Sequence, residues 1–133
     1  MKTVFADTFY FLALVNPRDQ AHARAVAYTR SFQGRMVTTA WILTELADAM
    51  SDPHNRGEFI ATLNDFKSNP QAAIIGPDAS LFEEGIQLYA ARRDKDWSLT
   101  DCISFVVMQR EGICEALTGD KHFEQAGFTA LLK

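Results

Sequence analysis

The chain has 133 residues, of which 47% are apolar and 23% charged, and its net charge is −4. This composition is typical of a folded globular protein, and the length fits one domain over residues 1–133. The negative charge argues against a protein that coats nucleic acid non-specifically, because such proteins are basic. It still allows an enzyme that meets nucleic acid through a local basic rim and a bound cation.

Short apolar runs alternate with longer periodic segments in the first half of the chain. These patterns predict a strand at Thr3–Ala6, helices at Thr8–Val15 and Asp19–Phe32, a strand at Met36–Thr39, and helices at Ala40–Ser51 and Gly57–Phe66. The N-terminal apolar stretch is interrupted by Asp7 and has no small-residue cleavage site, so we expect a strand and a helix there rather than a signal peptide. No segment is long enough to span a membrane, and we expect a cytoplasmic location.

The same alternation continues in the second half. It predicts a strand at Ala72–Ile75, a helix at Ala79–Arg93 capped by Asp78, a nearly all-apolar interior helix at Ser98–Gly112, and strands at Ile113–Leu117 and Phe128–Leu132. Strands separated by helices pair in parallel through right-handed crossovers. The predicted fold class is therefore α/β, arranged as a three-layer α/β/α sandwich.

Two aspartates follow predicted strands. Asp7 comes directly after the first strand, and Asp120 lies just beyond the fourth. In parallel sheets, ligands gather at the carboxyl ends of the strands, which places both side chains where chemistry is expected. Each aspartate could equally be the N-cap of the helix that follows it.

Two further acids lie on predicted helices. Glu45 shares a helical stripe with Ile42 and Leu46, so we expect it to face inward, where it would need a basic partner or a polar site. Asp48 lies off that stripe and is expected to be solvated. Asp101 has capping-box spacing after the serine at position 98, yet its helix has almost no polar face.

The four acids together predict a cation site. Two carboxylates about 5 Å apart repel by roughly 3 kcal/mol at an effective dielectric constant of about 20, so several of them need protons or a cation nearby. Hard divalent cations such as Mg²⁺ suit an all-oxygen site. No zinc constellation is present, because His22, His54 and His122 lack ligand spacing and are interpreted as surface or capping residues. Cys102 and Cys114 are interpreted as small buried residues in a reducing compartment.

Four segments carry a resemblance to a known family. The stretches VFADTFYFLALV, TTAWILTELADAM, WSLTDCISFVVMQREGI and ALTGDKHFEQAGF, in this order, resemble the PIN domain, a family of small metal-dependent nucleases. They span Val4 to Phe128, and the size and layout resemble the stand-alone VapC-type toxins of prokaryotes. The resemblance implies a five-stranded parallel sheet in the order 3-2-1-4-5.

The resemblance also implies roles for the acids. Asp7 and Asp101 would be the main ligands of Mg²⁺ or Mn²⁺. Glu45 and Asp120 would complete the pocket, directly or through water, and help to orient the attacking water. Thr118 matches the position of a hydroxyl that fixes a water or the last acid.

The implied partners are an RNA substrate, a protein antitoxin and a second copy of the chain, with no membrane involved. Arg92, Arg93 and Lys95 could hold RNA phosphates, or could be cations favoured at a helix C-terminus. Trp97 could stack on a base or be a buried anchor. Thr8 is a further candidate for a hydroxyl in the pocket.

The sequence thus predicts an endoribonuclease that depends on Mg²⁺ or Mn²⁺ and acts as the toxin of a toxin–antitoxin pair. One alternative is a small-molecule phosphatase with an aspartyl nucleophile, although the D-x-D arrangement that would favour it is missing at Asp7. The other is a catalytically silent module that binds RNA or serves as a scaffold.

Overall fold

A five-stranded parallel sheet forms the centre of the molecule, which we describe from a computed structural model covering residues 1–133. Its strands lie in the order β3-β2-β1-β4-β5, and every neighbouring pair is parallel. This confirms the predicted fold class and strand order. The strands are β1 (Thr3–Ala6), β2 (Arg35–Thr39), β3 (Ala72–Ile75), β4 (Glu115–Leu117) and β5 (Thr129–Ala130).

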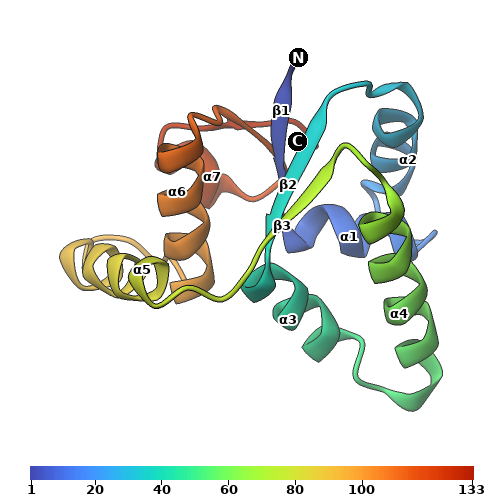
Figure 1. The fold of residues 1–133 in the computed structure, drawn as a ribbon, viewed down its shortest axis with the longest axis horizontal. Coiled ribbons are helices and arrows are strands. Elements are labelled where there is room, and N and C mark those ends of the chain that lie inside the picture. The colour runs from blue at the N-terminus through green and yellow to red at the C-terminus, as the bar shows by residue number, and fades with distance from the viewer.

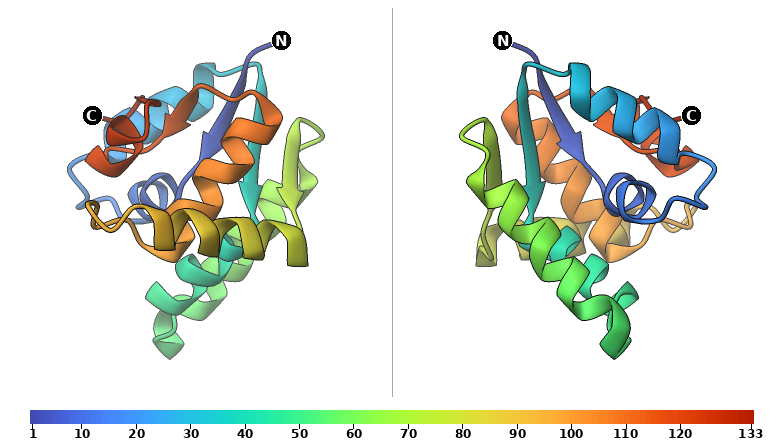
Figure 2. Two further views of the ribbon diagram at one scale, coloured as in Figure 1. Left: turned by 90° about the vertical axis from the view of Figure 1, so that its left-hand side faces the viewer. Right: turned by 90° about the vertical axis from the view of Figure 1, so that its right-hand side faces the viewer.

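Helices cover both faces of this sheet. In Figure 1, α1, α2 and α4 lie on one side of the strands and α5, α6 and α7 on the other, which confirms the three layers; Figure 2 shows the same arrangement from the two sides. None of the helices combines the length and the apolar character needed to cross a membrane. Their bounds are α1 (Thr8–Val15), α2 (His22–Ser31), α3 (Ala40–Ala49), α4 (Pro53–Ser68), α5 (Ala79–Ala91), α6 (Leu99–Glu111) and α7 (Lys121–Gln125).

The core lies around the central strand and the helix predicted to be interior. Val4, Phe5 and Ala6 of β1 have no exposed surface, as expected for a strand covered on both faces. Six of the 13 residues of helix α6, all between Cys102 and Met108, are buried and only its last three are exposed, in agreement with the prediction from its apolar sequence. Its Phe105 packs edge-on against Phe123, with ring centroids 5.0 Å apart.

Some element boundaries differ from the prediction. Helix α4 begins earlier, because Asp52 accepts a hydrogen bond from the N–H of His54 and proline occupies the first helical position. Helix α2 begins later, because the carboxylate of Asp19 accepts a hydrogen bond from the N–H of Ala21 and holds a turn. The last two strands are shorter than predicted.

The two cysteines differ in their surroundings. Cys102 of α6 is buried, as predicted, whereas Cys114 is exposed, so the prediction for Cys114 was wrong. Cys114 lies just before β4, which begins one residue later, and its side chain faces solvent. Both thiols are free.

The carboxyl ends of three neighbouring strands define one edge of the sheet. Strand β1 ends at Ala6, β2 at Thr39 and β4 at Leu117, and each is followed at once by a helix or by a short turn into one. Helix α3 lies beyond this edge of the sheet (Figure 1). Polar side chains that follow these strands therefore meet in one region.

Candidate metal centre

Asp7 lies at the carboxyl end of β1 and is almost fully buried, with 6% of its surface exposed. It occupies the N-cap position of α1, but its side chain makes no capping hydrogen bond. Instead, Asp7 Oδ2 accepts a hydrogen bond of 2.8 Å from the hydroxyl of Thr118, which follows β4. Asp7 thus holds the N-cap position of α1 without capping it through its side chain, and its carboxylate is held by a residue 111 positions away.

Thr118 links two of the acids. Its hydroxyl donates to Asp7, and the same oxygen accepts a hydrogen bond of 3.1 Å from the backbone N–H of Asp120. The carboxylate of Asp120 in turn caps α7, because Oδ1 accepts a hydrogen bond of 2.9 Å from the N–H of His122. A capping role and a position beside Asp7 thus coexist in Asp120.

Glu45 reaches the same region from α3, but its surroundings differ from the prediction. Ile42 and Leu46 are buried, whereas Glu45 is exposed, so the expectation that it faces inward was wrong. Glu45 lies at the edge of the buried stripe, where it avoids the desolvation penalty of the core. Its Oε1 accepts a hydrogen bond from the hydroxyl of Thr8, the residue next to Asp7. No lysine or arginine pairs with Glu45.

Asp101 combines the capping box with a place in the pocket. The backbone N–H of Asp101 donates to Ser98 Oγ at 3.0 Å, and Asp101 Oδ2 accepts from the backbone N–H of Ser98 at 3.1 Å. The same Oδ2 also contacts His122 Nδ1 at 3.0 Å. Only 14% of the Asp101 side chain is exposed. The cap therefore orients this carboxylate toward α7.

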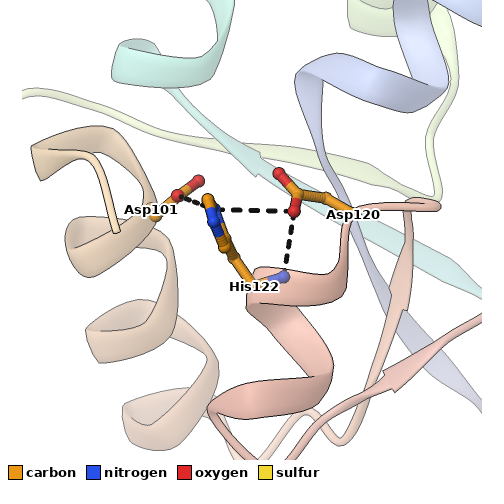
Figure 3. Close-up of side chains that lie close together, drawn as sticks. All are labelled: Asp101, Asp120 and His122. Atoms are coloured by element: carbon orange, nitrogen blue, oxygen red, sulfur yellow. Dashed lines mark hydrogen bonds and ion pairs between the residues drawn. The ribbon is translucent and has the colours of Figure 1, made fainter. Parts of the chain in front are cut away.

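His122 is the residue that sequence reasoning missed. Its interpretation as a surface or capping residue was wrong, because its imidazole lies between Asp101 and Asp120 with 21% of the side chain exposed (Figure 3). Ligand atoms of the three residues lie within 4.8 Å of one another. The available signal was its place two residues after Asp120, in the first turn of a helix at the carboxyl edge of the sheet. His22, by contrast, bonds the carbonyl of Ala13, as a capping histidine does.

Burial dominates the electrostatics of the pocket. It raises the pKa of Asp7 from 3.8 to about 7, with further increases from the charges of Asp101 and Glu45. The Thr118 hydroxyl and the backbone N–H of Thr8 act in the opposite direction. Burial also raises the pKa of Asp101, which the Ser98 N–H and the imidazole on α7 partly counteract. A cation in the pocket would relieve both effects.

The donor set fits a hard divalent cation. The side-chain hydrogen bonds fall on one oxygen of each acid: Oδ2 of Asp7, Oε1 of Glu45, Oδ2 of Asp101 and Oδ1 of Asp120. Hydrogen bonds of this kind orient the ligands of protein metal sites and leave the second oxygen for the ion. No lysine or arginine forms an ion pair with any of the four acids. Carboxylate oxygens are the ligands preferred by Mg²⁺ and Mn²⁺.

One known protein family matches almost the whole chain. The family model described as the PIN domain matches residues 4–129. The chain belongs to the PIN domain family. Asp7 and Asp120 of this PIN domain follow the carboxyl ends of β1 and β4, in a fold that it shares with solved structures. Comparison with curated protein sequences gave no significant match.

Solved structures with the same fold include several toxins of VapC type, which confirms the resemblance seen in the sequence. VapC20 of Mycobacterium tuberculosis, described as a toxin that cleaves the sarcin–ricin loop, is 25% identical, with a TM-score of 0.86 and coverage of 95% of this chain and 96% of its own. FitAcB of Neisseria gonorrhoeae is 17% identical (TM-score 0.68, coverage 96% and 94%). VapBC2 of Rickettsia felis, bound to promoter DNA, is 13% identical (TM-score 0.67, coverage 96% of both chains).

The basic residues before α6 in this PIN domain differ in how far other side chains engage them. The guanidinium of Arg92 binds Asp94 through two hydrogen bonds of 3.0 Å and lies 4.9 Å from the centroid of the Trp97 ring. Trp97 is buried and donates a hydrogen bond to the side-chain oxygen of the glutamine at position 125, so it is the anchor and not a base-stacking platform. Arg93 is exposed and Lys95 is half-buried. No hydrogen bond or ion pair ties these cations to the four acids.

Proposed function

We propose that this PIN domain is an endoribonuclease that uses Mg²⁺ or Mn²⁺ to hydrolyse RNA phosphodiester bonds. The observation that carries the proposal is a set of four carboxylates from four separate segments, in which the charges of Asp101 and Glu45 act on Asp7 and that of Asp120 acts on Asp101. No lysine or arginine is paired with any of them. Such an arrangement is unfavourable unless protons or a cation offset the repulsion. The family and the VapC-type neighbours support the choice of a nuclease.

We assign Asp7 and Asp101 as the principal metal ligands, because both are largely buried and held by hydrogen bonds from other elements. Glu45 and Asp120 are more exposed and complete the pocket, directly or through water. A bound divalent ion supplies polarisation of a phosphate oxygen and a lower pKa for the attacking water. Thr118 keeps the carboxylate of Asp7 in one orientation through its hydrogen bond to Oδ2.

We propose RNA as the substrate because VapC20, which shares the fold over nearly its whole length, is described as cleaving the sarcin–ricin loop. Arg93 and Lys95 are the remaining candidates for phosphate contacts, since Arg92 is committed to Asp94. Phosphate contacts position a nucleic acid without reading its sequence. The three basic residues named from the sequence thus contribute unequally.

Cleavage of a broad RNA panel tests the proposed activity. The wild-type chain is expected to cleave with Mg²⁺ or Mn²⁺ and to stop when EDTA is added, and Asp7→Asn is expected to be inactive under all conditions. Asp48→Asn is the matched control, because Asp48 is exposed on α3 and takes part in none of the hydrogen bonds of the four acids. Cleavage that persists in EDTA, or in Asp7→Asn, contradicts the assignment. RNA that is bound but never cut would instead identify a silent binding module.

We also propose that a protein antitoxin controls the activity. FitAcB, VapBC2 of Rickettsia felis and a toxin–antitoxin complex from Klebsiella pneumoniae share the fold. A groove of about 470 Å³ between α1, α2 and α4 offers an apolar surface with acidic groups near it, lined among others by Phe11, Leu14, Phe32, Phe66, Glu58 and Asp65. Co-purification with the product of a neighbouring small reading frame is the expected result. Failure of every such product to bind argues against a toxin–antitoxin pair.

A homodimer is the remaining proposed assembly. The chain has a mass of 14.9 kDa, so light scattering on the purified protein should give twice this value. A mass equal to the single chain at micromolar concentration would refute the dimer.

A further inference from the structure

One imidazole bridges two acids that belong to different helices. His122 Nδ1 lies 3.0 Å from Oδ2 of Asp101, on α6, and 3.5 Å from Oδ1 of Asp120, which precedes α7 (Figure 3). Both neighbours of this nitrogen are carboxylate oxygens, which accept hydrogen bonds. The nitrogen therefore carries the proton and donates, which assigns the tautomer from the hydrogen-bond network.

The two carboxylate oxygens nearest to His122 Nδ1 also accept hydrogen bonds from backbone N–H groups. Asp101 Oδ2 also accepts from the N–H of Ser98, and Asp120 Oδ1 also accepts from the N–H of His122 itself. Two donors thus hold one oxygen of Asp101, whereas one oxygen of Asp120 accepts from the backbone N–H and has the imidazole nitrogen 3.5 Å away. The remaining oxygens, Oδ1 of Asp101 and Oδ2 of Asp120, have no protein donor and are free to bind an ion.

No other contact in the molecule ties these two carboxylates together. The Ser98 cap fixes Asp101 within α6, and Thr118 fixes the backbone of Asp120 beside β4. These bonds hold each acid within its own element and do not join the two side chains, which repel each other as like charges. The imidazole of His122 is the one side chain that contacts both carboxylates.

We propose that His122 is a positioning residue that holds Asp101 and Asp120 at the spacing required for metal binding, through the proton on Nδ1. The inference rests on the proposed metal-dependent function. His122 itself makes no contact with the ion in this assignment. Residues that orient metal ligands in this way typically change metal affinity by 10–100-fold when they are replaced.

Three substitutions at one position separate the possible roles of the ring. His122→Asn keeps an N–H group near the place of Nδ1, His122→Gln keeps a polar nitrogen near the place of Nε2, and His122→Leu keeps the bulk without either. The measurement is the Kd for Mn²⁺ alone, by calorimetry or by the paramagnetic resonance of free Mn²⁺, at one fixed pH. We expect His122→Leu and His122→Gln to raise this Kd by about 10–100-fold and His122→Asn to stay within about 3-fold of the wild type.

Other outcomes overturn the proposal in identifiable ways. Unchanged affinity in His122→Leu shows that the imidazole only fills space. Rescue by His122→Gln and not by His122→Asn shows that the ring acts through Nε2, on the ion or on the substrate. If His122→Leu does not fold, the comparison of the other two variants decides. A wild-type chain that binds no Mn²⁺ overturns the metal centre and this inference together, whereas loss of binding in Asp7→Asn with normal binding in His122→Leu overturns only this inference.

Discussion

Replacing Asp7 by asparagine in the metal-free protein removes the most strongly perturbed charge of the pocket. Asparagine has nearly the same shape, and its side-chain oxygen can still accept the hydrogen bond from the Thr118 hydroxyl. Its amide group donates hydrogen bonds, which suits a site flanked by the carboxylates of Asp101 and Glu45. The substitution therefore changes the charge far more than the packing.

The size of the effect follows from the pKa of Asp7. Burial raises this pKa from 3.8 to about 7, a shift of about three units, and each unit corresponds to about 1.4 kcal/mol. Because the folded state binds the proton more tightly than the unfolded state, the stabilisation is fully present below about pH 4 and is lost as the pH rises toward 7. As the pH rises through this range, the free energy of unfolding of the wild type should therefore fall by at most about 4 kcal/mol relative to that of Asp7→Asn.

Urea unfolding in EDTA measures the difference. Between pH 5 and pH 8 the free energy of unfolding of Asp7→Asn relative to the wild type should rise by about 3 kcal/mol. Asp48→Asn, at an exposed position on α3, should follow the wild type within about 0.5 kcal/mol at both pH values. Saturating Mn²⁺ should stabilise the wild type and leave Asp7→Asn unchanged.

A variant that is less stable than the wild type at pH 8 in EDTA would refute this reasoning. So would a difference between the two proteins that does not change with pH. Either result would mean that the Asp7 carboxylate is favourably solvated or paired in the folded protein, and the case for a cation that offsets its charge would fail.

The remaining predictions concern individual contacts. Without divalent cation, Asp101→Asn should melt at the same or a higher temperature than the wild type, and a large loss would show that its capping role dominates. Thr118→Val removes a donor and an acceptor among buried groups, so urea unfolding should show a loss of about 1–3 kcal/mol together with weaker Mn²⁺ binding. Gly85→Ala on α5 should lose about 1–3 kcal/mol, because the new Cβ would lie 2.4 Å from Cγ1 of Ile103. Gly57→Ala on α4 is its matched control, since nothing lies within 4 Å, and it should gain up to about 1 kcal/mol.

The elements and part of the site were predictable because their signals are local. The apolar run at Thr3–Ala6 gave a buried strand, and the spacing of Ser98 and Asp101 gave a capping box that the structure contains. The rule for parallel sheets placed Asp7 and Asp120 at the same edge, using only their positions after strands. The strand order was implied by the family resemblance and not by periodicity, because the sequence of a strand does not name its neighbours.

The arrangement of side chains within the site needed the tertiary structure. Periodicity placed Glu45 on a helical stripe but could not say where the core ends, so its exposure was not foreseen. His122 carried no ligand spacing in the sequence, since its partner Asp101 lies 21 residues away on another helix. Arg92 was a candidate for phosphate until the ring of Trp97 and the carboxylate of Asp94 were seen beside it.

The sequence by itself determined which residues form strands and helices and which acids follow strand ends, because those properties depend on neighbours along the chain. Only the tertiary structure decided that Thr118 holds Asp7 and that His122 joins Asp101 to Asp120. These pairings depend on how far each helix is rotated about its axis and on which rotamer each side chain adopts. Packing across the whole molecule sets both, and no local pattern encodes them.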